Sequence, residues 1–215
     1  MSRFQAGPRL LAACALAALA CASQTTTRPP GASPRAPAEV RVMLETTAGE
    51  IVIAVDPERA PLSAGDFLRY VDRGLYDGAA FYRVVRADND HGEPRIQVVQ
   101  GGLSDESKAL PPIAHETTRA TGITHRDGTV SLARGGPGTG GGAAFFICIG
   151  DQPALDFGGR RNPDGLGFAA FGRVTRGMDV VRKIQALKSD APSDSPYMAG
   201  QLLSEPVVIL HARRD

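Results

Sequence analysis

Short runs of Val, Ile, Phe and Ala, separated by Gly, Pro, Asp and Asn, recur from residue 40 to residue 212. Runs of this length bounded by turn-forming residues are typical of β-strands. An antiparallel hairpin is expected over 40–56, where two apolar runs flank a Thr-Thr-Ala-Gly turn. Single strands are expected over 81–86, 96–100, 128–134, 144–150, 169–174 and 205–212.

Two amphipathic helices interrupt the strands. The first is expected over 60–76, with Pro61 to open it, Gly74 to close it, and an apolar face made of Leu62, Phe67, Tyr70 and Val71. The second is expected over 177–188, with an apolar side made of Met178, Val181, Ile184 and Leu187. Strands and helices do not alternate as in a parallel α/β fold. The pattern therefore predicts a mainly β protein, a closed antiparallel barrel with a helix at each end.

Residues 1–21 are expected to be a signal peptide of lipoprotein type rather than part of the fold. Two arginines precede the apolar run "LLAACALAALA" at 10–20, which is too short to span a bilayer. Cys21 is favoured as the lipidated residue because the full apolar run precedes it. Cys14 fits the usual cleavage box better but leaves almost no hydrophobic stretch before it. An ordinary cleaved signal is the remaining alternative.

Residues 22–39 are rich in Thr, Pro and Ala and lack a hydrophobic period, so a flexible tether is expected there. The folded domain is expected over 40–215. Together these segments predict an exported protein outside the cytoplasm, anchored by an N-terminal lipid at a bacterial membrane and facing the periplasm or the cell exterior. Cys148 is the one cysteine within 40–215, and it is expected to be a small buried hydrophobe.

Charge and motifs exclude several functions. With 24 Lys and Arg against 23 Asp and Glu, the net charge of +1 argues against a nucleic-acid partner. The glycine motif "GPGTGG" at 136–141 runs into a strand instead of a helix, which argues against a nucleotide site. The residues of two polar loops lack metal-ligand spacing and are explained by turn chemistry, namely His115, Glu116 and His125 in the first and Asp151, Asp156, Asn162 and Asp164 in the second. No metal and no cofactor are expected.

The segments "AAFYRVV", "VVQGG", "GTVSLARGGPGTG", "AFFICIG", "LDFGG" and "FAAFGRVTRGMDVV" follow one another in this order. In motifs, order and approximate spacing the chain resembles the cyclophilin family of peptidyl-prolyl cis–trans isomerases, over about residues 40–212. The resemblance implies a closed eight-stranded antiparallel barrel capped by two α-helices. It also implies isomerase activity on X–Pro bonds.

The resemblance places the catalytic arginine at Arg83 and the glutamine that contacts the substrate backbone at Gln100. It places the apolar pocket for the proline ring at Val98, Phe146 and Leu155, with Ala133 beside it and Phe168 at the rim. Alternation along a regular strand predicts that Phe81, Arg83 and Val85 share one face, with Tyr82, Val84 and Arg86 on the other.

Several positions depart from the family's common pattern. Gln97 replaces an aromatic wall residue, Ala144 a glutamine and Phe168 a histidine, while Ala154 stands where a large residue is common. The loop 87–95 is longer than usual. These departures predict weak or altered isomerase activity, and they leave a second hypothesis open, a chaperone or a module that binds proline-containing segments with little turnover. Under either hypothesis the partners are proline-containing polypeptides and the protein is expected to be monomeric.

Overall fold

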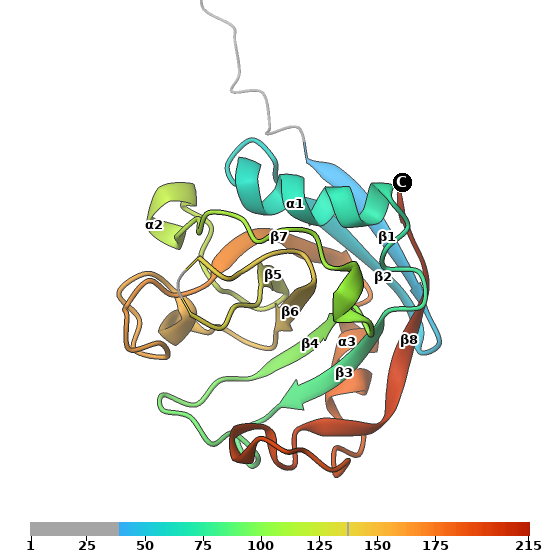
Figure 1. Ribbon diagram of the computed structural model, residues 1–215, viewed down its shortest axis with the longest axis vertical. Helices are drawn as coiled ribbons and strands as arrows, with labels where there is room; N and C mark the ends of the chain where they lie inside the picture. The colour runs from blue at the N-terminus through green and yellow to red at the C-terminus, as the bar shows by residue number, and fades with distance from the viewer. Residues whose placement is uncertain (1–38, 137) are drawn as a thin grey trace, which may run out of the picture. The chain divides into compact units, whose positions relative to one another are not determined.

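Eight antiparallel strands close into a barrel in the computed structural model, which describes residues 39–136 and 138–215 (Figure 1). The expectations for Cys14, Cys21, the signal and residues 22–38 of the tether lie outside the described residues. The strands are β1 (Val40–Thr46), β2 (Gly49–Val55), β3 (Ala80–Val85), β4 (Val98–Gly102), β5 (Thr129–Leu132), β6 (Ala144–Cys148), β7 (Ala169–Arg176) and β8 (Leu202–Arg214). Their order around the barrel is β1-β2-β7-β5-β6-β4-β3-β8, which confirms the predicted fold class.

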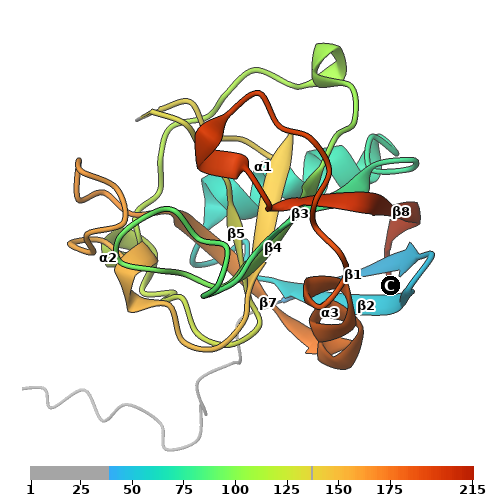
Figure 2. The same cartoon turned by 90° about the horizontal axis from the view of Figure 1, so that it is seen from below.

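The helices are α1 (Pro61–Asp72), α2 (Thr118–Thr121) and α3 (Met178–Gln185), and three 3₁₀ turns lie in the loops, η1 (Glu106–Lys108), η2 (Pro153–Leu155) and η3 (Pro196–Met198). Figure 1 shows α1 across the upper end of the barrel and α3 below it, behind β3. Seen from below, α3 lies beside β2, with which it is in contact (Figure 2). Within the described residues, no helix has the length and apolarity needed to cross a membrane.

The two predicted helices correspond to α1 and α3, but each apolar face was assigned one residue too many. Leu62 is 48% exposed, because it lies two helical turns from the exposed Arg69 and so shares its face. Leu187 is 40% exposed, because α3 ends at Gln185 and the chain turns away before reaching it. The residues that do cover the barrel, such as Phe67 and Ile184, are fully buried.

Aromatic rings fill the barrel next to α1. The Phe67 ring lies 4.8 Å from that of Phe171 and 5.4 Å from that of Phe145, and Phe145 also packs edge-on against Phe81. Gly101 lies so close to Phe81 that an added Cβ would come within 2.7 Å of its ring. This tight packing fixes β3 and β4 against each other.

A β-bulge in β3 changes the alternation predicted for residues 81–86. Phe81 pairs with Gly101 and Arg83 pairs with Gln100, so Tyr82 is an extra residue between them. Phe81 therefore points into the barrel core and not to the side of Arg83, and the predicted shared face of these two residues was wrong. Beyond the bulge, alternation resumes, with Val84 in the core and Val85 outside it.

The outer face of the sheet carries a second apolar cluster. Along β4 and β6, residues of the barrel core alternate with residues of this cluster, whose buried members are Val85, Ile96, Val98, Phe146, Cys148 and Leu155. Phe145 and Ile147 point inward, while Phe146 and Cys148 point outward. The cluster provides an apolar floor on the outside of the barrel, next to Arg83.

Candidate functional site

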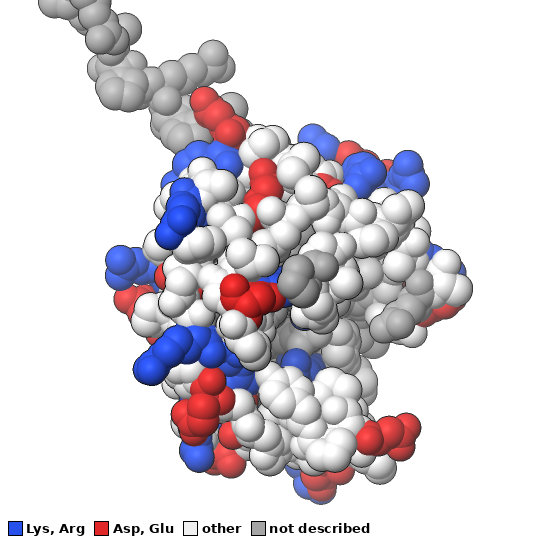
Figure 3. All heavy atoms as spheres, turned by 60° about the vertical axis from the view of Figure 1, so that its left-hand side comes forward, with Lys and Arg blue, Asp and Glu red and all other residues white. Residues whose placement is uncertain are grey.

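A cavity of about 320 Å³ opens above this outer apolar cluster. Its lining residues are Arg83, Ile96, Val98, Gln100, Ala133, Arg134, Phe146, Leu155, Arg161, Asn162, Phe168 and Tyr197. Every pocket residue predicted from the sequence is among them. On the face visible in Figure 3, acidic and basic side chains are interspersed, and neither kind gathers into one patch.

The floor of the cavity is apolar and rigid. Leu155 is fully buried, and Val98 and Phe146 are nearly so. Phe168 meets the Phe146 ring edge-on at 5.3 Å, and it therefore extends the apolar surface upward as a wall. A floor of this kind suits a small saturated ring and excludes water from one side of it.

Arg83 lies at the edge of this floor, held by two neutral amides. Its Nη1 donates a hydrogen bond to Gln100 Oε1 at 2.9 Å, and Gln100 Nε2 donates in turn to Tyr82 Oη at 2.8 Å. Its Nε and Nη2 both donate to Gln201 Oε1, at 2.9 and 2.6 Å. Within the described residues Arg83 forms no ion pair with a carboxylate, so its positive charge is oriented without being neutralised.

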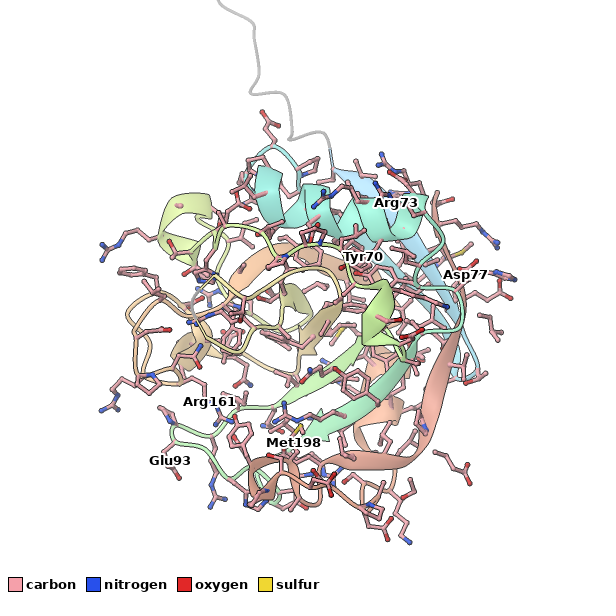
Figure 4. The ribbon with its side chains drawn as sticks, viewed as in Figure 1. Tyr70, Arg73, Asp77, Glu93, Arg161 and Met198 are labelled. Carbon is pink, nitrogen blue, oxygen red and sulfur yellow. The ribbon has the colours of Figure 1, made fainter. Side chains whose placement is uncertain are left out.

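Arg161 lines the cavity and ties the loop 87–95 to it. Its Nη1 and Nη2 each donate to one carboxylate oxygen of Asp90 at 2.7 Å, and both side chains are almost completely buried. Nη1 also donates to the Pro94 carbonyl at 2.9 Å, and Nη2 donates to Tyr197 Oη at 2.6 Å. In Figure 4, Arg161 lies on the same lower side of the barrel as Glu93 and Met198. The long loop is therefore bonded to the cavity wall from behind, through Arg161.

Asp90 remains ionised in this setting. Burial alone would raise its pKa, but hydrogen bonds from Arg161 and from the backbone N–H groups of Ile96 and Gly92 outweigh burial and lower the pKa. The buried guanidinium and carboxylate therefore form a charged, bidentate pair with a defined geometry.

Arg134 separates this cavity from a second one of about 750 Å³. Its side chain is 2% exposed and donates to both carboxylate oxygens of Asp164, at 2.8 and 2.9 Å, and to the Gly167 carbonyl at 2.9 Å. Gln100 and Ala133 also line both cavities, and Ala144 lines the second. The two cavities are therefore neighbours on the outside of the barrel.

His125 links Asp156 and Ser131 below the floor. His125 Nδ1 lies 2.7 Å from Asp156 Oδ1, and Nε2 lies 3.0 Å from Ser131 Oγ. The order of residues is that of a hydrolytic triad, but Ser131 is fully buried and His125 is 1% exposed, so a substrate cannot reach the hydroxyl. The His125 ring stacks on Phe146 at 5.9 Å, and the network therefore supports the floor.

Five lining residues were not predicted from the sequence: Ile96, Arg134, Arg161, Asn162 and Tyr197. Ile96 could have been predicted, because it lies two positions before Val98, on the same side of the strand expected over 96–100, and supplies apolar surface next to the exposed Gln97. Tyr197 and the Arg83 partner Gln201 follow the last helix and carry no local signal. Arg161 and Asn162 were read only as part of a polar loop.

No group of three or more His, Cys, Asp or Glu side chains in the described ranges is arranged to hold a metal ion. Cys148 is fully buried in the floor, as predicted, and burial raises the pKa of its thiol.

Comparisons with known proteins bear on this geometry. Residues 41–213 match the family model described as "Cyclophilin type peptidyl-prolyl cis-trans isomerase/CLD". "Peptidyl-prolyl cis-trans isomerase A" of Dickeya dadantii is 34% identical over 175 residues, which are 80% of this chain and 83% of that protein. "Peptidyl-prolyl cis-trans isomerase cyp18" of Streptomyces antibioticus is also 34% identical, over 69% of this chain and 84% of that protein.

Solved structures show the same fold. A crystal structure of a Cryptosporidium parvum cyclophilin superimposes with a TM-score of 0.59 at 18% identity, covering 82% of this chain and 98% of the other. A second crystal structure of that protein, in the presence of the dipeptide Ala-Pro, gives a TM-score of 0.58.

Proposed function

The chain belongs to the family of cyclophilin-type peptidyl-prolyl cis–trans isomerases, and we propose that it isomerises X–Pro bonds of exported proteins in the cavity beside Arg83. The observation that carries the proposal is the guanidinium of Arg83, fixed by two neutral amides at the edge of an apolar floor. An unneutralised, directed cation next to a water-excluding surface is the equipment that this reaction needs.

The chemistry explains why so few groups suffice. Resonance gives the X–Pro bond partial double-bond character, with a rotational barrier of about 18–20 kcal/mol. In the twisted transition state the conjugation is lost, and the proline nitrogen becomes pyramidal and basic. No covalent bond forms and no proton leaves, so neither a nucleophile nor a general base is required. A catalyst lowers the barrier by binding the twisted amide more tightly than the planar one.

In the proposed mechanism the proline ring enters above Val98, Phe146 and Leu155, and Phe168 covers its side. Arg83 donates to the twisted amide, for which its planar and permanently charged donors are suited. Gln100 is hydrogen-bonded to Arg83 and lines both cavities, so it is placed to contact the peptide backbone. The residues before the proline extend into the second cavity.

The site of action is proposed from the N-terminal sequence. The apolar run followed by Cys21 supports export and lipid anchoring, with Cys14 as the alternative lipid site, and the Thr/Pro/Ala-rich segment supports a tether. Uncatalysed isomerisation takes tens to hundreds of seconds, which is slow enough to be the rate-limiting step in the folding of an exported chain. The proposed partners are proline-containing polypeptides, and the proposed working form is a monomer.

A proline-binding module with little turnover is the second candidate, and the wall of the second cavity favours it. Ala144 offers no polar group there to a substrate backbone. A peptide held mainly by the apolar floor would be bound without the restraint on both sides of the X–Pro bond that twisting requires.

The test is a measurement of cis–trans exchange in a short X–Pro peptide by NMR, with the full chain at catalytic concentration. Wild-type protein is expected to accelerate exchange, and Arg83→Ala is expected to lower the acceleration at least tenfold while the peptide still binds. Arg83→Lys keeps the charge but loses the planar arrangement of donors, so its acceleration of exchange should lie between those of the wild type and Arg83→Ala. Binding without exchange in the wild type would support the module instead, and the absence of both would overturn the proposal.

A further inference from the structure

One part of the cavity wall comes from segments that none of the cyclophilin-like motifs contains. Arg161 and Asn162 belong to the loop between η2 and β7, and Tyr197 belongs to η3, between α3 and β8. These three residues line the same cavity as Arg83 and Gln100. The wall is therefore available to any peptide that Arg83 contacts.

The wall is rigid because the buried Asp90–Arg161 pair ties its parts together. Arg161 bonds to the loop 87–95 through Asp90 and the Pro94 carbonyl, and to η3 through Tyr197 Oη at 2.6 Å. Bidentate charged hydrogen bonds between buried groups fix orientation as well as distance. Tyr197 and its neighbours are thus held in place before a ligand arrives.

Tyr197 presents an aromatic ring near two cations. The centre of the ring lies 5.3 Å from Arg83 Cζ and 5.7 Å from Arg161 Cζ, and the residue is 46% exposed. Exposed aromatic rings along grooves are the usual partners of proline rings in peptide recognition. Tyr197 therefore supplies aromatic surface to a cavity in which position 97 is an exposed glutamine.

Asn162 presents a donor without a partner. Asn162 lines the cavity, and its buried Nδ2 has no hydrogen-bond partner among the described residues. Buried side-chain amide groups nearly always have a hydrogen-bond partner. A peptide that enters the cavity brings backbone carbonyl oxygens, which are acceptors of the required kind.

We propose that Tyr197 and Asn162 are substrate-contacting residues, with the Tyr197 ring packed on the peptide's proline and Asn162 Nδ2 donating to a backbone carbonyl of the same peptide. This inference rests on the proposed function and deepens it, because it assigns part of the binding of the peptide to a wall that faces the ligand together with the apolar floor. Arg161 and Asp90 position the wall and do not touch the peptide.

The test measures peptide affinity and exchange separately, in the full chain, by NMR titration with a short X–Pro peptide. Tyr197→Ala is expected to weaken binding about tenfold, whereas Tyr197→Phe, which keeps the ring, stays within about threefold of the wild type. Asn162→Ala is expected to weaken binding about fivefold. Asn162→Asp should weaken it further, because a carboxylate cannot donate to a carbonyl.

Leu62→Ala, which truncates an exposed apolar residue on α1, is the matched control and should leave affinity unchanged. Retained dispersion of the amide spectrum shows that each variant is folded. Unchanged affinity in both Tyr197→Ala and Asn162→Ala, in a protein that still accelerates exchange through Arg83, overturns this inference and leaves the proposed function standing. A wild-type protein that neither binds nor isomerises the peptide overturns the proposed function itself.

Discussion

Gln201 Oε1 accepts two hydrogen bonds from Arg83, one from Nε at 2.9 Å and one from Nη2 at 2.6 Å. Gln201 is fully buried and is itself fixed, because its Nε2 donates to the Asn89 carbonyl at 2.7 Å. A carboxylate at this position would orient the guanidinium equally well but would also neutralise it. The neutral amide orients Arg83 and leaves its charge for the substrate.

Replacing Gln201 is therefore expected to reduce turnover more than peptide affinity. In Gln201→Leu the guanidinium loses its fixed orientation, and we expect kcat to fall about tenfold, the loss of roughly one hydrogen bond to a charged group. Gln201→Glu should lower kcat at least as much, because the added carboxylate pairs with Arg83. Saturation kinetics by NMR exchange separate kcat from KM, and a change confined to KM would contradict the positioning role.

Asp90→Asn is expected to destabilise the protein by about 3–5 kcal/mol at pH 7, because the buried guanidinium of Arg161 loses its counter-charge. Urea unfolding followed by circular dichroism measures the difference. Asp88→Asn is the matched control, since Asp88 lies on the same loop with its carboxylate 75% exposed. Equal stability of the two variants would mean that the Asp90–Arg161 pair does not hold the wall.

Acid should weaken the fold through Asp90 and Asp156, whose pKa values are both lowered. For Asp156, burial opposes the shift, but hydrogen bonds from His125 outweigh it. A carboxyl whose pKa is lower in the folded protein stabilises the fold fully above its unfolded pKa of about 3.9 and loses that contribution as the pH falls through the folded value. The urea concentration at the unfolding midpoint should fall as the pH is lowered from 5 to 3. The difference in this midpoint between the wild type and Asp90→Asn should narrow over the same range.

Ser131→Ala is expected to keep isomerase activity within about twofold and to cost about 1 kcal/mol of stability, the value of one hydrogen bond. Ser131 Oγ is buried beneath the floor and is hydrogen-bonded to the His125 ring, so it serves packing and not nucleophilic chemistry. A serine-directed phosphonate should leave the wild-type protein unlabelled. Labelling at Ser131 would show that the network opens to the surface.

Cys148 should resist thiol reagents in the folded state. Burial removes access to the sulfur and raises the thiol's pKa, so little thiolate forms at neutral pH. In a Cys14→Ser, Cys21→Ser chain, modification by a disulfide reagent should follow the unfolding rate and accelerate in urea in parallel with loss of structure. Rapid modification without denaturant would contradict the burial of the floor.

The barrel and its floor could be predicted because their signals are local. The alternation of core and outer residues along β4 and β6 appears in adjacent sequence positions, and the arginine and glutamine motifs lie within single strands, β3 and β4. The β-bulge was not predictable in this way, because Tyr82 fits a regular strand as well as an irregular one. Only pairing with Gly101 and Gln100 shows that one residue is extra.

The wall made of Arg161, Asn162 and Tyr197 could not be predicted from the sequence, for a different reason. Arg161 meets Asp90 across 71 positions, and Arg83 meets Gln201 across 118. Polar residues in glycine-rich loops look alike in a sequence, whether they face solvent or form a buried ion pair. What distinguishes them is the closure of the barrel, which brings distant loops to one edge.

The position of β8 in the barrel has a consequence for biosynthesis. This strand pairs with both β1 and β3, so the ring of strands stays open until the stretch Leu202–Arg214 has been made. Tyr197 and Gln201 come from the residues just before it. A nascent chain that already carries Arg83 therefore has no finished pocket until these later residues have been added. The enzyme becomes able to act on other chains only after β8 has left the ribosome and closed the barrel.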